Sequence, residues 1–143
     1  MSKSRVAPKK SVTIPRLELQ AAVLASKTAK FLQLELNIPS DKHFFWTDSR
    51  VVLGYIQNSS RRFHIYVANR VQQICDVSSP GQWSYVDTKE NPADHASRGL
   101  SVRDMISLNW YSGPSFLWQQ QIERKSETFS PILMLCFNLH CSQ

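Results

Sequence analysis

The sequence predicts an α/β fold in a single domain. Apolar residues recur at helical spacing from Pro15 to Asn37, a compact aromatic run follows from His43 to Thr47, and helix-like and strand-like segments alternate after it. The chain has 143 residues, of which 42% are hydrophobic and 20% are charged. That length is enough for one packed core and too short for two well-built ones. We therefore expect one sheet whose strands are covered by helices.

A long helix is predicted near the amino-terminal end. Pro15 fits its first turn, because the N–H that proline lacks has no partner there, and Asn37 followed by Pro39 ends the helical pattern. Residues 11–14, just before it, are short and β-prone. The stripe that predicts the buried face of the helix consists of Leu17, Ala21, Leu24, Thr28, Phe31 and Leu32.

The aromatic run His43–Thr47 predicts a strand that is buried on both faces, because its middle residues are all large and apolar. Asp48 and Ser49 end this strand, and either side chain can cap the helix predicted from Arg50 to Gln57.

Shorter elements follow up to the Gly113-Pro114 turn. We expect residues 1–112 to form the domain and residues 113–143, which include an isolated apolar window at 131–137, to form a poorly ordered linker and tail. The predicted elements are a helix from about Arg62 to Cys75, a strand from Trp83 to Val86, a short helix opened by Asp94 and ended by Gly99, and another from Ser101 to Leu108.

The charge balance favours a polyanionic partner. The chain holds 17 Lys and Arg against 11 Asp and Glu, a net charge of +6. Its three cysteines, Cys75, Cys136 and Cys141, have no zinc-ligand spacing. The first residues lack the apolar run of a secretory signal, and no apolar window approaches the roughly 20 residues that span a bilayer. We expect an intracellular protein without a membrane partner.

Three acidic residues stand where predicted elements begin or end: Glu18 in the long helix, Asp48 after the aromatic strand, and Asp94 in the late helix. Carboxylates gathered at such ends suit the hard cations Mg²⁺ and Mn²⁺, which prefer oxygen ligands. Two such ions can activate a water and stabilise the leaving oxygen in phosphodiester cleavage. Alternatively, Glu18 interacts with its own helix dipole, and Asp48 and Asp94 are amino-terminal caps. Spacing alone leaves both interpretations open.

Four motifs follow one another along the chain: residues 13–22 (TIPRLELQAA), 45–49 (FWTDS) with 52–56 (VLGYI), 62–63 (RF) with 67–71 (VANRV), and 91–99 (NPADHASRG). Together they resemble the ribonuclease H region of BEL/Pao-type retrotransposon polyproteins, over roughly residues 3–118. The resemblance implies a ribonuclease H-like fold, a mixed sheet flanked by helices. In that family four carboxylates hold two Mg²⁺ or Mn²⁺ ions against an RNA strand paired to DNA.

Carried over by motif, Glu18 is the carboxylate of the first helix, Asp48 that of the fourth strand and Asp94 that of the last helix. Residues 3–14 resemble the third strand, so the chain lacks the family's first two strands, and with them the fourth carboxylate. The absent first strand is central in the family's sheet and lies beside the strand that carries Asp48. We therefore expect a remnant that is inactive alone and that self-associates through the exposed edge of the aromatic strand.

A set of basic residues predicts contact with nucleic acid, either an RNA–DNA hybrid or another strand. The alternative function is thus a non-catalytic nucleic-acid-binding module, with aromatic residues such as Tyr66 as stacking surfaces. A solvated helix face over core aromatics explains the same residues. The basic residues in question are Arg61, Arg62, Arg70 and Arg98.

Overall fold

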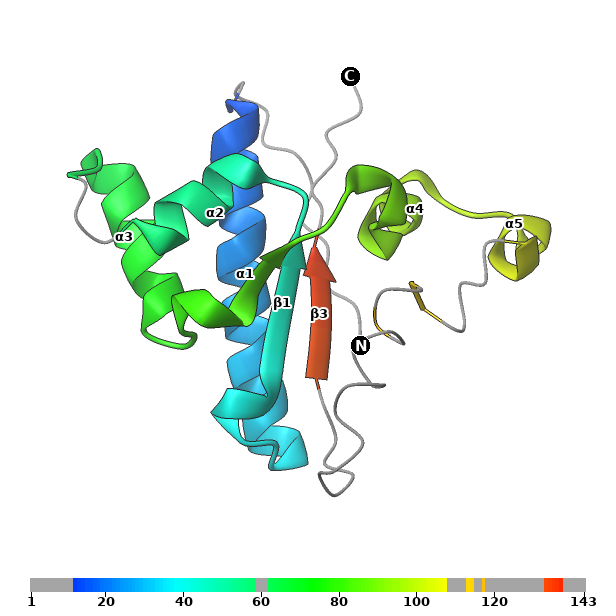
Figure 1. Cartoon of the computed structure of the whole chain (residues 1–143), viewed down its shortest axis with the longest axis horizontal. Helices are drawn as coiled ribbons and strands as arrows, with labels where there is room; N and C mark the ends of the chain where they lie inside the picture. Colours follow the sequence, from blue (N-terminus) through cyan, green and yellow to red (C-terminus); the bar gives the residue numbers. More distant parts are fainter. Residues whose placement is uncertain (1–11, 59–61, 108–112, 115–116, 118–132, 138–143) are drawn as a thin grey trace.

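The computed structural model describes residues 12–58, 62–107, 113–114, 117 and 133–137. Its three strands form one sheet in the order β2-β1-β3, and helices pack against it (Figure 1). The α/β class predicted from the sequence is therefore confirmed. None of the described helices is long and apolar enough to cross a membrane. The elements are α1 (Ile14–Leu36), η1 (Ser40–Lys42), β1 (His43–Thr47), α2 (Arg50–Gln57), α3 (Ile65–Cys75), η2 (Pro80–Gln82), β2 (Trp83–Tyr85), η3 (Thr88–Glu90), α4 (Pro92–Arg98), α5 (Val102–Ser107) and β3 (Leu133–Phe137).

Helix α1 begins one residue before the predicted proline and ends where predicted. Thr13 is its N-cap, and the carbonyl of Thr13 accepts hydrogen bonds from the amides of Arg16 (3.0 Å) and Leu17 (3.2 Å). Asn37 ends the helix in the left-handed conformation, with φ of 52°. Ile14 thus belongs to the helix, and its predicted strand conformation is wrong. Most of the segment that resembles a third strand, residues 3–11, lies outside the described part of the chain.

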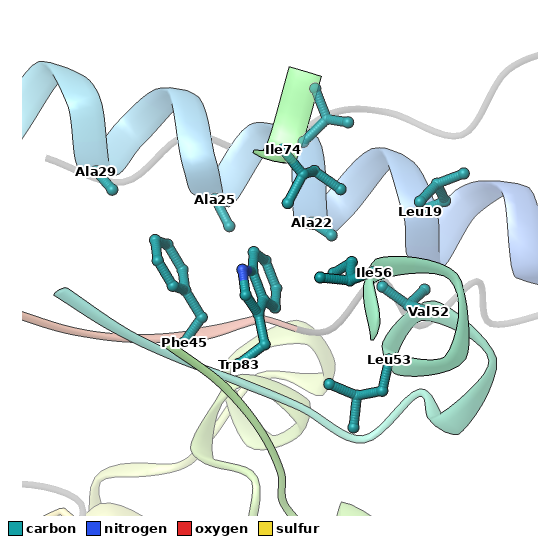
Figure 2. Packing of buried hydrophobic residues seen from close by; sticks show 11 residues of the cluster. Leu19, Ala22, Ala25, Ala29, Phe45, Val52, Leu53, Ile56, Ile74 and Trp83 are labelled. Atoms are coloured by element: carbon teal, nitrogen blue, oxygen red, sulfur yellow. The ribbon is translucent and has the colours of Figure 1, made fainter. Parts of the chain in front are cut away.

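The core lies between α1 and the sheet. Ala22, Ala25 and Ala29 of α1 face the rings of Phe45 and Trp83 (Figure 2). These two rings stack with their centroids 4.5 Å apart, because Phe45 of β1 and Trp83 of β2 are partners in the parallel register. Alanine has the small volume that lets a helix approach stacked aromatic rings closely, as close-packed interiors require. The same core receives side chains from α2 and α3, so five elements share it.

Side-chain hydrogen bonds stabilise the segments in which β1 and β2 begin. The Gln82 side-chain amide donates to the carbonyls of Ser40 and His43, both at 2.7 Å, and so joins η2 to the start of β1. The Trp83 indole N–H donates to the Ser78 hydroxyl over 2.9 Å, which satisfies the one polar group of a buried side chain.

Strand β3 lies in the segment that the sequence assigned to a linker and tail. It pairs in parallel with β1 at every residue of both strands, from His43 with Leu133 to Thr47 with Phe137. Residues 133–137 of the segment expected to be a linker and tail are thus a paired strand, while the division of the chain at residue 112 stays a prediction. The physical reason is that a buried strand must pair its backbone N–H and C=O groups on both edges, and this apolar segment does so for β1.

The predicted open edge of β1 is likewise wrong, because β2 and β3 occupy its two edges. Self-association itself stays a prediction, which the pairing of β1 does not test. β3 takes a position beside β1, the strand that precedes Asp48, and Figure 1 shows the two strands side by side.

The ring of His43, at the start of β1, is fully buried at 0% exposure. Neither of its nitrogens, Nδ1 or Nε2, has a hydrogen-bond partner among the described residues. Burial lowers the pKa of His43 below its ordinary value of 6.5, while the nearby carboxylate of Asp41 acts in the opposite direction. The folded protein therefore keeps this imidazole neutral at pH values where the unfolded chain protonates it.

We predict that stability falls as the pH drops below about 6.5. In that range the unfolded state binds a proton that the folded state does not, so the free energy of unfolding falls by up to about 1.4 kcal/mol per pH unit. Urea unfolding of the wild type and of His43→Leu, measured from pH 7.5 down to 5, should show a steeper loss in the wild type. His64→Leu, which removes an exposed histidine, is the matched control and should keep the wild-type slope. Equal slopes for His43→Leu and the wild type would contradict the burial of a neutral imidazole.

We also predict that Leu135→Pro converts the chain to larger species. Proline removes an N–H from the ladder and is not tolerated in a paired strand, so the β1 edge that β3 covers should open. Light scattering after size exclusion compares this variant with Leu135→Val, which keeps the N–H and should retain the wild-type size. An unchanged size for Leu135→Pro would mean that β3 does not protect that edge in solution.

Candidate functional site

The carboxyl end of β1 brings together two of the three acidic residues singled out from the sequence. The Ser49 hydroxyl donates a hydrogen bond of 2.7 Å to the Glu18 Oε2 atom. Ser49 directly follows Asp48, so Glu18 of α1 lies within one hydrogen bond of the residue next to Asp48. Both carboxylate side chains are half-buried. Glu18 of α1 thus lies at the carboxyl end of β1, and its role as a metal ligand beside Asp48 stays a prediction.

Ser49 itself is held in place by three hydrogen bonds. Besides the bond to Glu18, its hydroxyl accepts from the Val52 amide at 3.2 Å, and its own amide donates to the Thr47 hydroxyl at 3.2 Å. Ser49 is thus the N-cap of α2, in the conformation that favours serine. One buried hydroxyl both starts α2 and fixes a Glu18 oxygen.

The alternative interpretation of Asp48 and Asp94 as helix caps is wrong, and the dipole interpretation does not account for Glu18. Ser49, not Asp48, caps α2, and the Asn91 side chain, not Asp94, caps α4 by accepting from the Ala93 amide at 3.1 Å. Glu18 lies beyond the first turn of α1, which contains no acidic residue. A stabilising effect of the helix dipole is confined to the first turn, so it does not account for Glu18.

Asp94 lies in the first turn of α4 and is buried, with 7% exposure. Helix α4 packs beside β3, on the far side of that strand from the α1–α3 cluster in Figure 1. Within the described ranges, no three Asp, Glu, His or Cys side chains form a group that could hold a metal ion. A metal-ligand role for Asp94 together with Glu18 and Asp48 therefore stays a prediction.

A centre that holds two metal ions with four carboxylates needs more acidic ligands than Glu18 and Asp48. Glu18 and Asp48 supply the oxygen donors that Mg²⁺ prefers, but one Glu18 oxygen already accepts the Ser49 hydroxyl. Strand β3, whose sequence is LMLCF, contributes no carboxylate beside β1. The described residues therefore do not fit a centre in which four carboxylates hold two ions.

Arginine side chains lie over tyrosine rings close to the same acids. The guanidinium carbon of Arg50, two residues after Asp48, is 4.6 Å from the ring centroid of Tyr85. That of Arg16, two residues before Glu18, is 5.0 Å from the ring centroid of Tyr66. Both distances are within the range of a cation–π interaction. Neither Arg16 nor Arg50 was among the basic residues selected from the sequence, because their partners are distant along the chain.

The basic residues selected from the sequence differ in their contacts and exposure. Arg70 of α3 lies over Tyr66 at 4.8 Å, and Arg62 is exposed before α3. Arg61 and the side chain of Arg98 lie outside the described residues. Tyr66 and Arg70 are four apart in a predicted helix, so their contact could be anticipated from helical spacing.

Residues 1–49 match the family model described as the Pao retrotransposon-like RNaseH-like domain. No curated protein and no solved structure matches the chain. The matched span contains the first motif and the FWTDS motif, and therefore Glu18 and Asp48, whereas the two later motifs lie beyond it. This match supports the resemblance noted from the sequence. The amino-terminal third of the chain is therefore similar to the Pao retrotransposon-like RNase H-like domain.

Proposed function

We propose that the chain is a remnant of a retrotransposon ribonuclease H domain that does not cleave RNA–DNA hybrids by itself. The intact family cuts the RNA strand of a hybrid with metal ions held by four carboxylates. The observation that carries the proposal is the identity of the strand beside β1. That strand is β3, an apolar segment without an acidic residue.

Strand β3 supplies the backbone pairing that β1 needs, but not a metal-binding carboxylate. β3 pairs with β1 throughout its length and so supplies the backbone partner that the sheet needs. It does not supply the bridging carboxylate that the resemblance assigns to a strand in this place. A two-metal mechanism requires both ions, one to activate the water and one to stabilise the leaving oxygen. An incomplete ligand set would lower activity steeply, because each ion depends on shared carboxylates.

The arginines near Glu18 and Asp48 are suited to binding nucleic acid without cleaving it. Glu18 and Asp48 lie at one end of β1, and arginines lie close to each of them in sequence. The net charge of +6 favours polyanions over the whole surface. The alternative function, a non-catalytic nucleic-acid-binding module, is supported by these arginine–tyrosine contacts and is compatible with the loss of cleavage.

We predict that the purified chain does not release labelled fragments from an RNA–DNA hybrid in Mg²⁺ or Mn²⁺. The physical reason is the missing carboxylate beside β1. A fluorophore–quencher hybrid follows cleavage continuously, and an unrelated active ribonuclease H shows that the substrate is competent.

The decisive control is Asp48→Asn, which replaces a ligand oxygen by an amide and keeps the size of the side chain. Trace cleavage that is equal in the wild type and in this variant comes from a contaminant and agrees with the proposal. Cleavage by the wild type that Asp48→Asn abolishes would overturn it, and would show that other residues of this chain complete the site.

A further inference from the structure

Two arginines from different helices converge on a single tyrosine ring. Arg16 belongs to α1, whereas Tyr66 and Arg70 belong to α3, and the two helices pack against each other (Figure 1). The guanidinium carbons lie 5.0 Å (Arg16) and 4.8 Å (Arg70) from the Tyr66 ring centroid. We define these three residues as the Arg–Tyr–Arg cluster.

The cluster carries two positive charges with no acidic partner in the described part of the chain. The Arg16 and Arg70 guanidinium groups take part in the contacts with Tyr66 and in no ion pair with another described residue. Two like charges held by one ring repel each other, and the π face of the ring offsets only part of that repulsion. An anion that binds both groups would remove the repulsion.

Phosphate is the anion that this geometry fits best. Each guanidinium carries five N–H donors in a planar fork that matches two phosphate oxygens. The contact with the Tyr66 ring restrains each guanidinium group, so less side-chain entropy is lost on binding. Arg50 over Tyr85 repeats the arrangement on α2. Repeated arginine–aromatic contacts in a chain with a charge of +6 suit a polymer of phosphates rather than a single ion.

We propose that the Arg–Tyr–Arg cluster binds the phosphodiester backbone of a nucleic acid, with Arg16 and Arg70 each contacting a phosphate and Tyr66 orienting them. The inference deepens the proposed function, since it rests on a nucleic-acid partner for this domain. It does not depend on whether the chain cleaves that partner.

The test is a binding measurement with the full chain in EDTA, where metal-dependent cleavage cannot occur. Fluorescence anisotropy is recorded with a labelled RNA–DNA hybrid and a labelled single-stranded RNA over a series of salt concentrations. Arg16→Ala/Arg70→Ala should weaken binding about 10-fold or more. The slope of log K against log salt should fall by about 2, because each lost phosphate contact removes about one unit.

The matched control is Lys27→Ala/Lys30→Ala, which removes the same charge from exposed positions of α1 outside the cluster. It should change the affinity less than about threefold, as expected for long-range charge alone. Arg16→Lys/Arg70→Lys keeps the charge but loses the fork, so its affinity should lie between the wild type and the alanine variant. Tyr66→Phe keeps the ring and should bind like the wild type.

Specific outcomes would overturn the proposal. Equal weakening by the arginine and the lysine double variants would show that only net charge matters. Displacement of the RNA by poly-glutamate at equal charge concentration would show a general acidic-polymer surface instead of a phosphate site. Should the alanine variant lose its cooperative unfolding, Arg16→Gln/Arg70→Gln, which keeps the length of the side chains, gives the same comparison. Cleavage in a separate Mg²⁺ assay would overturn the proposed loss of activity and would leave the binding proposal intact, so the two failures are distinguishable.

Discussion

The pairing of β1 along both edges is the constraint on which the rest of the structure depends. Its residues are among the most deeply buried in the described chain, with Phe45 at 0% exposure. Backbone groups at such depth need hydrogen-bond partners, since leaving them unpaired costs free energy comparable to a lost hydrogen bond. β2 satisfies one edge and β3 the other. The second pairing places a segment from near the carboxyl terminus at the edge of the sheet, beside β1.

The short side chains of α1 turn this sheet into a core and also position the candidate site. Ala25 and Ala29 are fully buried against the Phe45–Trp83 stack (Figure 2), so α1 lies close to the sheet along its length. That closeness brings Glu18 to Ser49 at the end of β1. It also brings Arg16 to Tyr66 of α3. The packing of α1 thus determines both the contact of Glu18 with Ser49 and the Arg–Tyr–Arg cluster.

Under the proposed function, the fold has kept its scaffold while losing part of its chemistry. A strand needs only compatible backbone and apolar side chains, which Leu133–Phe137 supplies. A two-metal centre needs specific carboxylates at specific places. The first requirement is met by many sequences and the second by few, so a domain can retain pairing and lose a ligand. Binding of a phosphate backbone by arginines is less demanding than catalysis, because a modest shift of a long side chain is tolerated.

The sequence by itself determined the local elements and the family resemblance of the amino-terminal third. Helix α1, strand β1 and helix α2 were predicted within a residue or two, because helical spacing, proline positions and an uninterrupted apolar run are properties of neighbouring residues. Helix α3 begins at Ile65 rather than Arg62, a difference at a boundary, where local signals are weakest. Glu18 and Asp48 were also selected from the sequence, because they lie where these elements begin or end.

Only the tertiary structure decided which distant segments meet. The sequence could not show that Leu133–Phe137 covers the edge of β1, that Arg16 reaches Tyr66, or that the Ser49 hydroxyl donates to Glu18. Each of these outcomes depends on competition among segments far apart in the chain for the same edge or the same face. Propensity and periodicity describe what a segment can form, whereas burial and backbone pairing across the whole domain select its partner.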